Sequence, residues 1–295
     1  MPGGEDTFWL WRCRSVLSCL LPLGCCESTT STIQPPSPAA SEAKLNHRIR
    51  MPPPRLPRKE DFPPNLVLDI VPPSKGAPVN VLLLLHGIGD TNRQFTELAK
   101  ILNLPETVCI SLQGFSPIPP FFTGSSTPAF HWANDMLIDS QTGTVDLGGG
   151  GFDRPARTLR TAVLDVLTTT CAFPARNILF LGYGQGAMLP LYFAASNPDI
   201  ILGGIVAIGA RLPSSSYPTR KSKTPVLLCG GSRSREVTRS AVDALKASFE
   251  DTKYVKWEKP DDSMPANREE MLPIMQFFAR RLQSRAGVPE GAVEV

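Results

Sequence analysis

Short apolar segments alternate with amphipathic ones from about residue 66 to residue 284. The segment 80–85 is almost continuously apolar, which is typical of a strand that helices cover on both faces. Segment 157–168 instead carries apolar residues near helical spacing. The alternation predicts a mainly parallel sheet of about seven or eight strands with helices on both faces. Strands are expected at Leu66–Val71, Asn80–Leu85, Glu106–Leu112, Asn177–Gly182, Ile200–Ile208, Thr224–Cys229 and Tyr254–Trp257, and helices at Thr91–Leu102, Arg157–Thr168, Gly186–Ala195, Val237–Phe249 and Arg268–Leu282.

Residues 113–154 interrupt this alternation with a long segment rich in proline, glycine and aromatic residues. It includes the pair Phe121–Phe122 and the sequence Phe130-His131-Trp132. Loops of this length without regular structure more often serve a function than merely connect two elements. Two interpretations remain open, because the aromatic side chains could line a binding site or simply pack the loop onto the domain.

The N-terminal 64 residues differ in composition from the rest of the chain. Residues 1–27 are apolar and contain cysteines, and they allow three interpretations: a disordered end, a peripheral membrane contact or a cleaved signal. Residues 28–64 are rich in Pro, Ser and Thr and are basic, which predicts an extended linker. We therefore expect one folded domain at 66–284, followed by a short tail at 285–295.

Overall composition excludes several classes of protein. The chain has 295 residues, of which 42% are hydrophobic, and this is enough for a sizeable core. A net charge of +3 is too small to indicate nucleic-acid binding. No apolar run approaches the ~20 residues that a membrane-spanning helix needs.

The positions of the cysteines and histidines limit the kinds of site that the chain could form. Cys109, Cys171 and Cys229 lie in or beside apolar segments, which favours buried, reduced thiols and a cytoplasmic location. No cysteine and histidine cluster has metal-ligand spacing, so neither a metal nor another cofactor is expected. The chain has three histidines, and none follows His131.

The strongest motif is a strand–turn–helix at residues 178–192, where Gly182, Gly184 and Gly186 are spaced two residues apart. A Gly-x-Ser-x-Gly nucleophile elbow has the same layout, because its outer glycines let the strand and the helix approach closely. Here the central position carries Gly184 in place of serine. Glycine has no side-chain oxygen, so no acyl-enzyme can form at this position.

Two segments, Leu84-Leu-His86-Gly87-Ile88-Gly89-Asp90-Thr91 and Phe180-Leu-Gly182-Tyr-Gly184-Gln185-Gly186, resemble the phospholipase/carboxylesterase family, which includes the acyl-protein thioesterases. The resemblance implies an α/β-hydrolase fold over residues 66–284 and a small acyl ester or thioester as the ligand. It also implies an oxyanion hole formed by the backbone N–H groups of Ile88 and Gln185. The pocket residues that it implies are His86, Gly87, Trp132 and Gly184.

All three members of the family's catalytic triad are missing. Gly184 occupies the nucleophile position, the aspartate expected near Ser234 is absent, and the stretch 259–265 lacks the family's histidine. We therefore expect a catalytically degenerate hydrolase that keeps a binding pocket for an acyl or carbonyl group. Two alternatives stay open: an active ester or thioester hydrolase with a different nucleophile, and an adaptor tethered to a membrane through its N-terminal segment.

Overall fold

The computed structural model describes residues 53–135, 137–138, 141, 145–146, 151–214 and 220–285. The expected N-terminal segment 1–27 lies outside these residues, as do most of the linker 28–64 and the tail 285–295 apart from Arg285. Within the described ranges, no helix combines the length and the apolar character that crossing a membrane requires.

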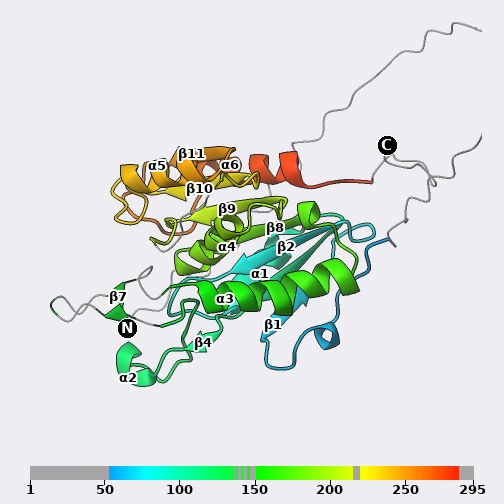
Figure 1. The fold of residues 1–295 in the computed structure, drawn as a ribbon, viewed down its shortest axis with the longest axis horizontal. Coiled ribbons are helices and arrows are strands. Elements are labelled where there is room, and N and C mark those ends of the chain that lie inside the picture. The colour runs from blue at the N-terminus through cyan, green and yellow to red at the C-terminus, as the bar shows by residue number, and fades with distance from the viewer. Residues whose placement is uncertain are drawn as a thin grey trace, which may run out of the picture.

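A seven-stranded sheet forms the centre of the molecule (Figure 1). Its strands follow the order β1-β3-β2-β8-β9-β10-β11, and β1 is antiparallel to β3 while all other neighbours are parallel. This arrangement confirms the expected α/β-hydrolase fold with a mostly parallel sheet. The strands are β1 (Leu68–Val71), β2 (Asn80–Leu85), β3 (Thr107–Leu112), β8 (Ile178–Tyr183), β9 (Gly204–Ile208), β10 (Val226–Gly230) and β11 (Thr252–Lys256).

Helices cover both faces of the sheet, and the alternation of side chains along β2 assigns each residue to a face. Leu82 and Leu84 belong to an apolar cluster with α1 (Arg93–Leu102) and α6 (Arg268–Arg281). The alternate residues of β2 face a second, larger cluster. Full burial of a leucine side chain contributes about 1.5–3 kcal/mol, so the two clusters hold the layers together.

The second face is covered by the remaining long helices. They are α4 (Gln185–Ser196), α5 (Arg239–Ser248) and the helical segment 153–170, which runs in front of the sheet in Figure 1. Almost every residue of α4 is buried, which is typical of a helix at the centre of a domain. This helix begins at the turn where the glycine motif lies.

The segment expected as an α-helix at Arg157–Thr168 is helical, but most of it has the wider turn of a π-helix. It begins as α3 (Asp153–Thr158) and continues as π-helix over Leu159–Leu164 and Val166–Thr170. Leu159, Val163 and Leu167 recur every four residues and are fully buried. A π-helix needs more residues per turn than an α-helix, so the wider turn keeps a four-residue repeat on one face.

The expected loop at 113–154 contains short elements of its own. Strands β4 (Ser116–Pro117) and β5 (Phe130–His131) form an antiparallel pair, and α2 (Pro120–Thr123) lies between them. Two further strands, β6 (Leu137–Ile138) and β7 (Val145–Asp146), pair with each other.

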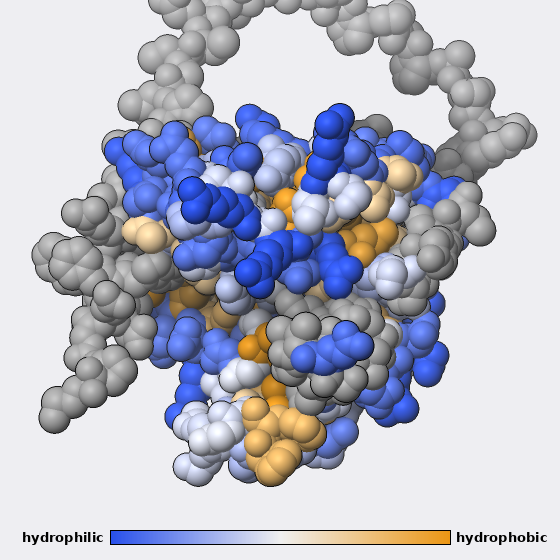
Figure 2. All heavy atoms as spheres, turned by 90° about the vertical axis from the view of Figure 1, so that its left-hand side faces the viewer, coloured by the Kyte–Doolittle hydropathy of each residue, from blue (hydrophilic) through white to orange (hydrophobic). Residues whose placement is uncertain are grey.

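The short helix α2 projects from the domain with its aromatic side chains in solvent. Phe121 is 90% exposed and Phe122 is 53% exposed, and the surface view shows an apolar patch at this end of the molecule (Figure 2). Trp132, in the same loop, is instead fully buried. The loop therefore has exposed aromatic residues at α2 and a buried one at Trp132.

Residues 53–64, at the end of the expected linker, pack against the domain. Phe62 is buried in the larger apolar cluster, and the Arg55 backbone N–H donates to the Cys171 carbonyl at 3.1 Å. The Arg55 guanidinium binds both carboxylate oxygens of Asp61, at 2.7 and 2.9 Å. This bond to Arg55 lowers the pKa of Asp61 to about 2. Packing therefore begins before the expected domain start at residue 66.

Candidate functional site

The turn between β8 and α4 holds Gly184 in a backbone conformation that glycine favours. Its φ is +50° and its ψ is −124°, and its N–H donates to the Ile208 carbonyl on the neighbouring strand at 2.8 Å. A Cβ added at this position would have no heavy atom within 4 Å. The turn therefore presents position 184 to open space, as a nucleophile elbow presents its serine.

The two outer glycines allow backbone contacts that any larger residue would prevent. A Cβ on Gly182 would lie 2.5 Å from Cα of Ala187, and a Cβ on Gly186 would lie 2.2 Å from the carbonyl oxygen of His86. The elbow and the segment after β2 are therefore packed backbone to backbone. The structure brings together the two segments that carry Ile88 and Gln185.

His86 uses both ring nitrogens to hold this part of the backbone. The Gly114 N–H donates to Nε2 at 2.8 Å, so Nε2 carries no proton and Nδ1–H donates to the Gly87 carbonyl at 2.6 Å. Burial lowers the pKa of His86, and the side chain is fully buried. Since both nitrogens are occupied in the neutral ring, His86 shapes the loop and has no free position for accepting a substrate proton.

Trp132 joins this loop to the elbow. Its indole N–H donates to the His86 carbonyl at 2.8 Å, and its backbone N–H donates to Oε1 of Gln185 at 2.7 Å. The rings of His86 and Trp132 also contact each other, with centroids 5.1 Å apart. All three side chains are buried, and together they support the elbow: His86, Trp132 and Gln185.

The loops after β10 and β11 meet beside the elbow through Ser234 and Asp262. The Ser234 hydroxyl donates to Oδ2 of Asp262 at 2.7 Å, and the Gly231 N–H donates to Oδ1 at 2.9 Å. The Val237 N–H donates to the Ser234 oxygen at 2.7 Å. These are the two loops on which the family's acid and histidine are expected, and here they are joined by a serine and an aspartate.

Asp262 contacts Gly209, the residue that follows the β9 residue hydrogen-bonded to Gly184. A Cβ on Gly209, whose φ is +59°, would lie 2.6 Å from Cβ of Asp262. The pKa of Tyr183 is raised by burial and then by the charges of Asp262 and Asp261. Tyr183 in turn packs against Gly87, where a Cβ would lie 2.7 Å from its ring. The carboxylate of Asp262 therefore contributes negative charge next to the elbow.

A cavity of about 510 Å³ lies between the segment after β3 and α3, next to the buried network of His86, Trp132 and Gln185. Gly114 lines it, and its N–H donates to His86. Ala133 also lines it and directly follows Trp132. Of the residues expected in the pocket (His86, Gly87, Trp132 and Gly184), none is among the described residues that line this cavity. The expected pocket at the elbow and the cavity are thus separate places, joined through the neighbours of Trp132.

The described residues offer little for metal-binding or thiol chemistry at the site. Within the described ranges, no group of three or more His, Cys, Asp or Glu side chains has a geometry that could hold a metal ion. Cys229 lies at the end of β10 near Ser234, and burial raises the pKa of its thiol to about 12. Almost none of this thiol is ionised at neutral pH, which makes it a poor nucleophile.

The sheet order and the elbow define an α/β-hydrolase, and comparison of sequences identifies its family. The sequence profile of the phospholipase/carboxylesterase family matches residues 68–282. The chain therefore belongs to the phospholipase/carboxylesterase family.

Individual relatives agree with this assignment. An uncharacterised hydrolase of Schizosaccharomyces pombe is 27% identical over 235 residues, which cover 79% of this chain and 95% of the relative. An uncharacterised hydrolase of Mycosarcoma maydis is 30% identical over 229 residues, which cover 72% and 80%.

Solved structures show the same fold. Acyl-protein thioesterase 2 of Zea mays superimposes with a TM-score of 0.55 at 22% identity, covering 74% of this chain and 99% of the plant protein. A carboxylesterase of Bacillus cereus gives a TM-score of 0.55 at 18% identity, covering 74% and 95%. At these identities the likeness establishes the architecture alone.

Proposed function

We propose that this chain is a catalytically degenerate member of its family that binds an acyl or carbonyl group without cleaving it. The observation that carries the proposal is Gly184 at the centre of an otherwise intact elbow, facing open space. A glycine there removes the attacking oxygen and relieves about 1–3 kcal/mol of backbone strain that a serine would have to bear.

The second support is the chemistry of the position where the family has its histidine. Asp262 accepts hydrogen bonds from Ser234 and Gly231 in the loop where that histidine is expected. At neutral pH an ionised carboxylate only accepts hydrogen bonds, whereas imidazole can take up a proton and pass it to a leaving group. An acyl transfer through this pair of loops therefore lacks its general acid–base.

Binding without cleavage needs only the backbone groups that glycine leaves in place. The N–H groups of Ile88 and Gln185 are our candidates for contacting a carbonyl oxygen, because backbone donors do not depend on side chains. The name of the related maize thioesterase supports an acyl group as the ligand. Three buried free cysteines, Cys109, Cys171 and Cys229, support a cytoplasmic location.

One alternative has a specific observation in its favour. Ser234 donates a hydrogen bond to the Asp262 carboxylate at 2.7 Å, which is a serine paired with a potential base. If the chain is an active hydrolase with a different nucleophile, Ser234 is the first candidate. Its oxygen also accepts the Val237 N–H, so as it stands this hydroxyl is engaged at both donor and acceptor positions.

A fluorophosphonate probe tests the proposal, because it labels an activated serine without requiring a known substrate. We expect no label on the wild-type protein and only very slow label on Gly184→Ser, which restores an oxygen without its base. The triple variant Gly184→Ser, Ser234→Asp, Asp262→His rebuilds the missing groups. It should be labelled at position 184 on the order of 10³-fold faster than the single variant.

The control is Ser234→Ala in the otherwise unchanged protein, with thermal melting used to confirm that every variant is folded. Label on the wild-type protein that maps to residue 234 and disappears in Ser234→Ala would replace the proposal with the alternative hydrolase. Label on Gly184→Ser alone, at the rate of the triple variant, would show that Asp262 can act as the base.

A further inference from the structure

We propose that the 510 Å³ cavity beside α3 is a binding site for a small organic carboxylate with an apolar body. The cavity lies within the size range of about 300–1,000 Å³ that small-molecule sites occupy. Its walls come from the segment before β1, the segment after β3, the residues around β5 and the start of α3. It does not depend on the chemistry at Gly184, which lies outside its lining.

The charge of the cavity is set by one side chain. Among the described residues that line it, Arg154 is the single charged one, and the remainder are polar or apolar. Arg154 is exposed at the edge of the cavity, and among the described residues its guanidinium has no ion-pair partner. An arginine that faces a cavity without an acidic partner attracts an anion, and its planar group binds a carboxylate through two parallel hydrogen bonds.

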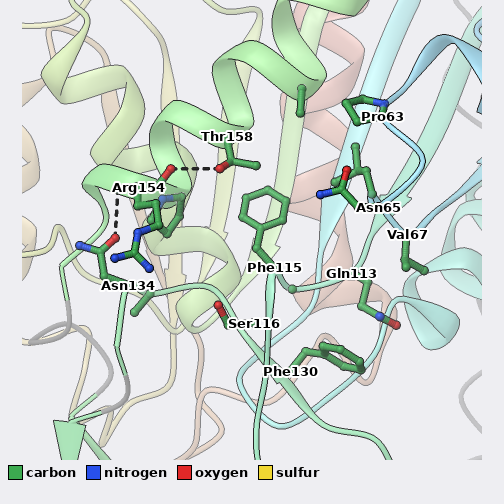
Figure 3. Close-up of a pocket in the computed structure, with 15 residues that line it drawn as sticks. Pro63, Asn65, Val67, Gln113, Phe115, Ser116, Phe130, Asn134, Arg154 and Thr158 are labelled. Carbon is green, nitrogen blue, oxygen red and sulfur yellow. Dashed lines mark hydrogen bonds between the residues drawn. The ribbon is translucent and has the colours of Figure 1, made fainter.

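Neutral polar side chains lie on both sides of the cavity. Figure 3 shows Arg154 and Asn134 on one side of the cavity, Asn65 on the opposite side and the ring of Phe115 between them. The side-chain oxygen of Asn134 accepts the Arg154 backbone N–H at 3.0 Å, so its amide NH₂ is the part of Asn134 that remains to donate. Carboxylate recognition is therefore favoured over recognition of a cation.

The apolar walls define the rest of the ligand. Phe115 and Phe130 both line the cavity and are half-buried, so each offers ring surface to a ligand. Phe115 is held in place by an edge-on contact with Trp132, with centroids 5.2 Å apart at 74°. A rigid aromatic wall next to one arginine suits a molecule with an acidic head and an aromatic or aliphatic body.

Calorimetric titration with 4-phenylbutanoate tests the site, and 4-phenylbutan-1-ol serves as the uncharged ligand of the same body. We expect the acid to bind the full-length protein with a Kd on the order of 0.1–1 mM. Arg154→Gln should weaken binding by about tenfold or more, and Arg154→Lys should fall between, because lysine keeps the charge but lacks the planar fork. The alcohol should bind at least about tenfold more weakly than the acid.

The matched control is Arg157→Gln, which removes the same charge from the same helix at an exposed position outside the cavity. It should leave the Kd of 4-phenylbutanoate within about twofold. Equal binding to the wild type and Arg154→Gln, or no binding of the acid at millimolar concentration, would overturn the proposal. The fluorophosphonate result would stand in either case, since that probe reads position 184.

Discussion

Three glycines spaced two residues apart serve two different purposes in this structure. Gly182 and Gly186 are required by close backbone contacts, whereas Gly184 occupies open space with a positive φ. Sequence alone could not separate these roles, because all three positions fit the same motif. The distinction has energetic consequences that substitution with alanine makes visible.

We expect Gly186→Ala to destabilise the protein by about 3 kcal/mol or more, because the new methyl group would overlap the His86 carbonyl. Gly184→Ala should cost only about 1–2 kcal/mol, since its methyl group has room and bears backbone strain alone. Urea denaturation of the two variants measures the difference. Similar losses at both positions would mean that the elbow and the segment after β2 do not touch as described.

At the scale of elements, residues 53–64 behave as an N-terminal strap on the domain. Its Phe62 enters the core, and its Arg55 binds Asp61. Composition predicted an extended linker over these residues, because proline and basic residues dominate them. A single buried phenylalanine and a paired arginine are too few to stand out against that composition.

Asp61→Asn should loosen this strap, because the amide loses the charge that pairs with Arg55. The expected fall in melting temperature is roughly 2–4 °C at neutral pH, since the arginine is partly exposed to water. Asp165→Asn, at an exposed position on the helical segment 153–170, is the control and should change little. The ion pair would be unimportant if both variants melted with the wild type.

At the scale of the whole molecule, buried histidines link stability to pH. Burial lowers the pKa values of both His86 and His131 below that of an unfolded histidine, near 6.5. The unfolded chain therefore binds more protons than the folded one as the pH falls through about 6.5. Stability from this source is present above that pH and is lost on acidification.

Urea midpoints should accordingly fall as the pH is lowered from about 7 to about 5. The carboxylate of Asp61 contributes almost nothing in this window, because its pKa of about 2 in the folded chain and its pKa of 3.8 in the unfolded chain both lie below it. His131→Gln should make the pH dependence shallower while His86 maintains part of it. Midpoints that stay constant or rise on acidification would show that these rings are not buried as neutral groups.

The fold could be predicted from the sequence because it depends on local patterns. The apolar run Asn80–Leu85 and the glycine motif at 182–186 place two central strands and the turn between β8 and α4. The widened helix at 159–170 could not be predicted, since a four-residue repeat over a few turns also fits an α-helix. The ends of several elements also differ from the prediction by a few residues; β9, for example, begins at Gly204 and not at Ile200.

The site could be predicted only in part. Motifs predicted that the segments of His86 and Gln185 meet, and Trp132 joins them through hydrogen bonds. The bond between Ser234 and Asp262 depends on how two loops meet in space, which no spacing encodes. The cavity at Arg154 has no sequence signature, because its walls come from distant segments with no shared motif.

The hydrogen bond between Ser234 and Asp262 also bears on how such a protein could change over generations. A serine at position 184 alone would gain a hydroxyl without a base, and a change at position 234 or 262 alone would break an existing contact between two loops. Under the proposed function, each single step toward hydrolysis would therefore either add nothing or cost stability. Gaining hydrolysis from this arrangement would then require several coordinated mutations.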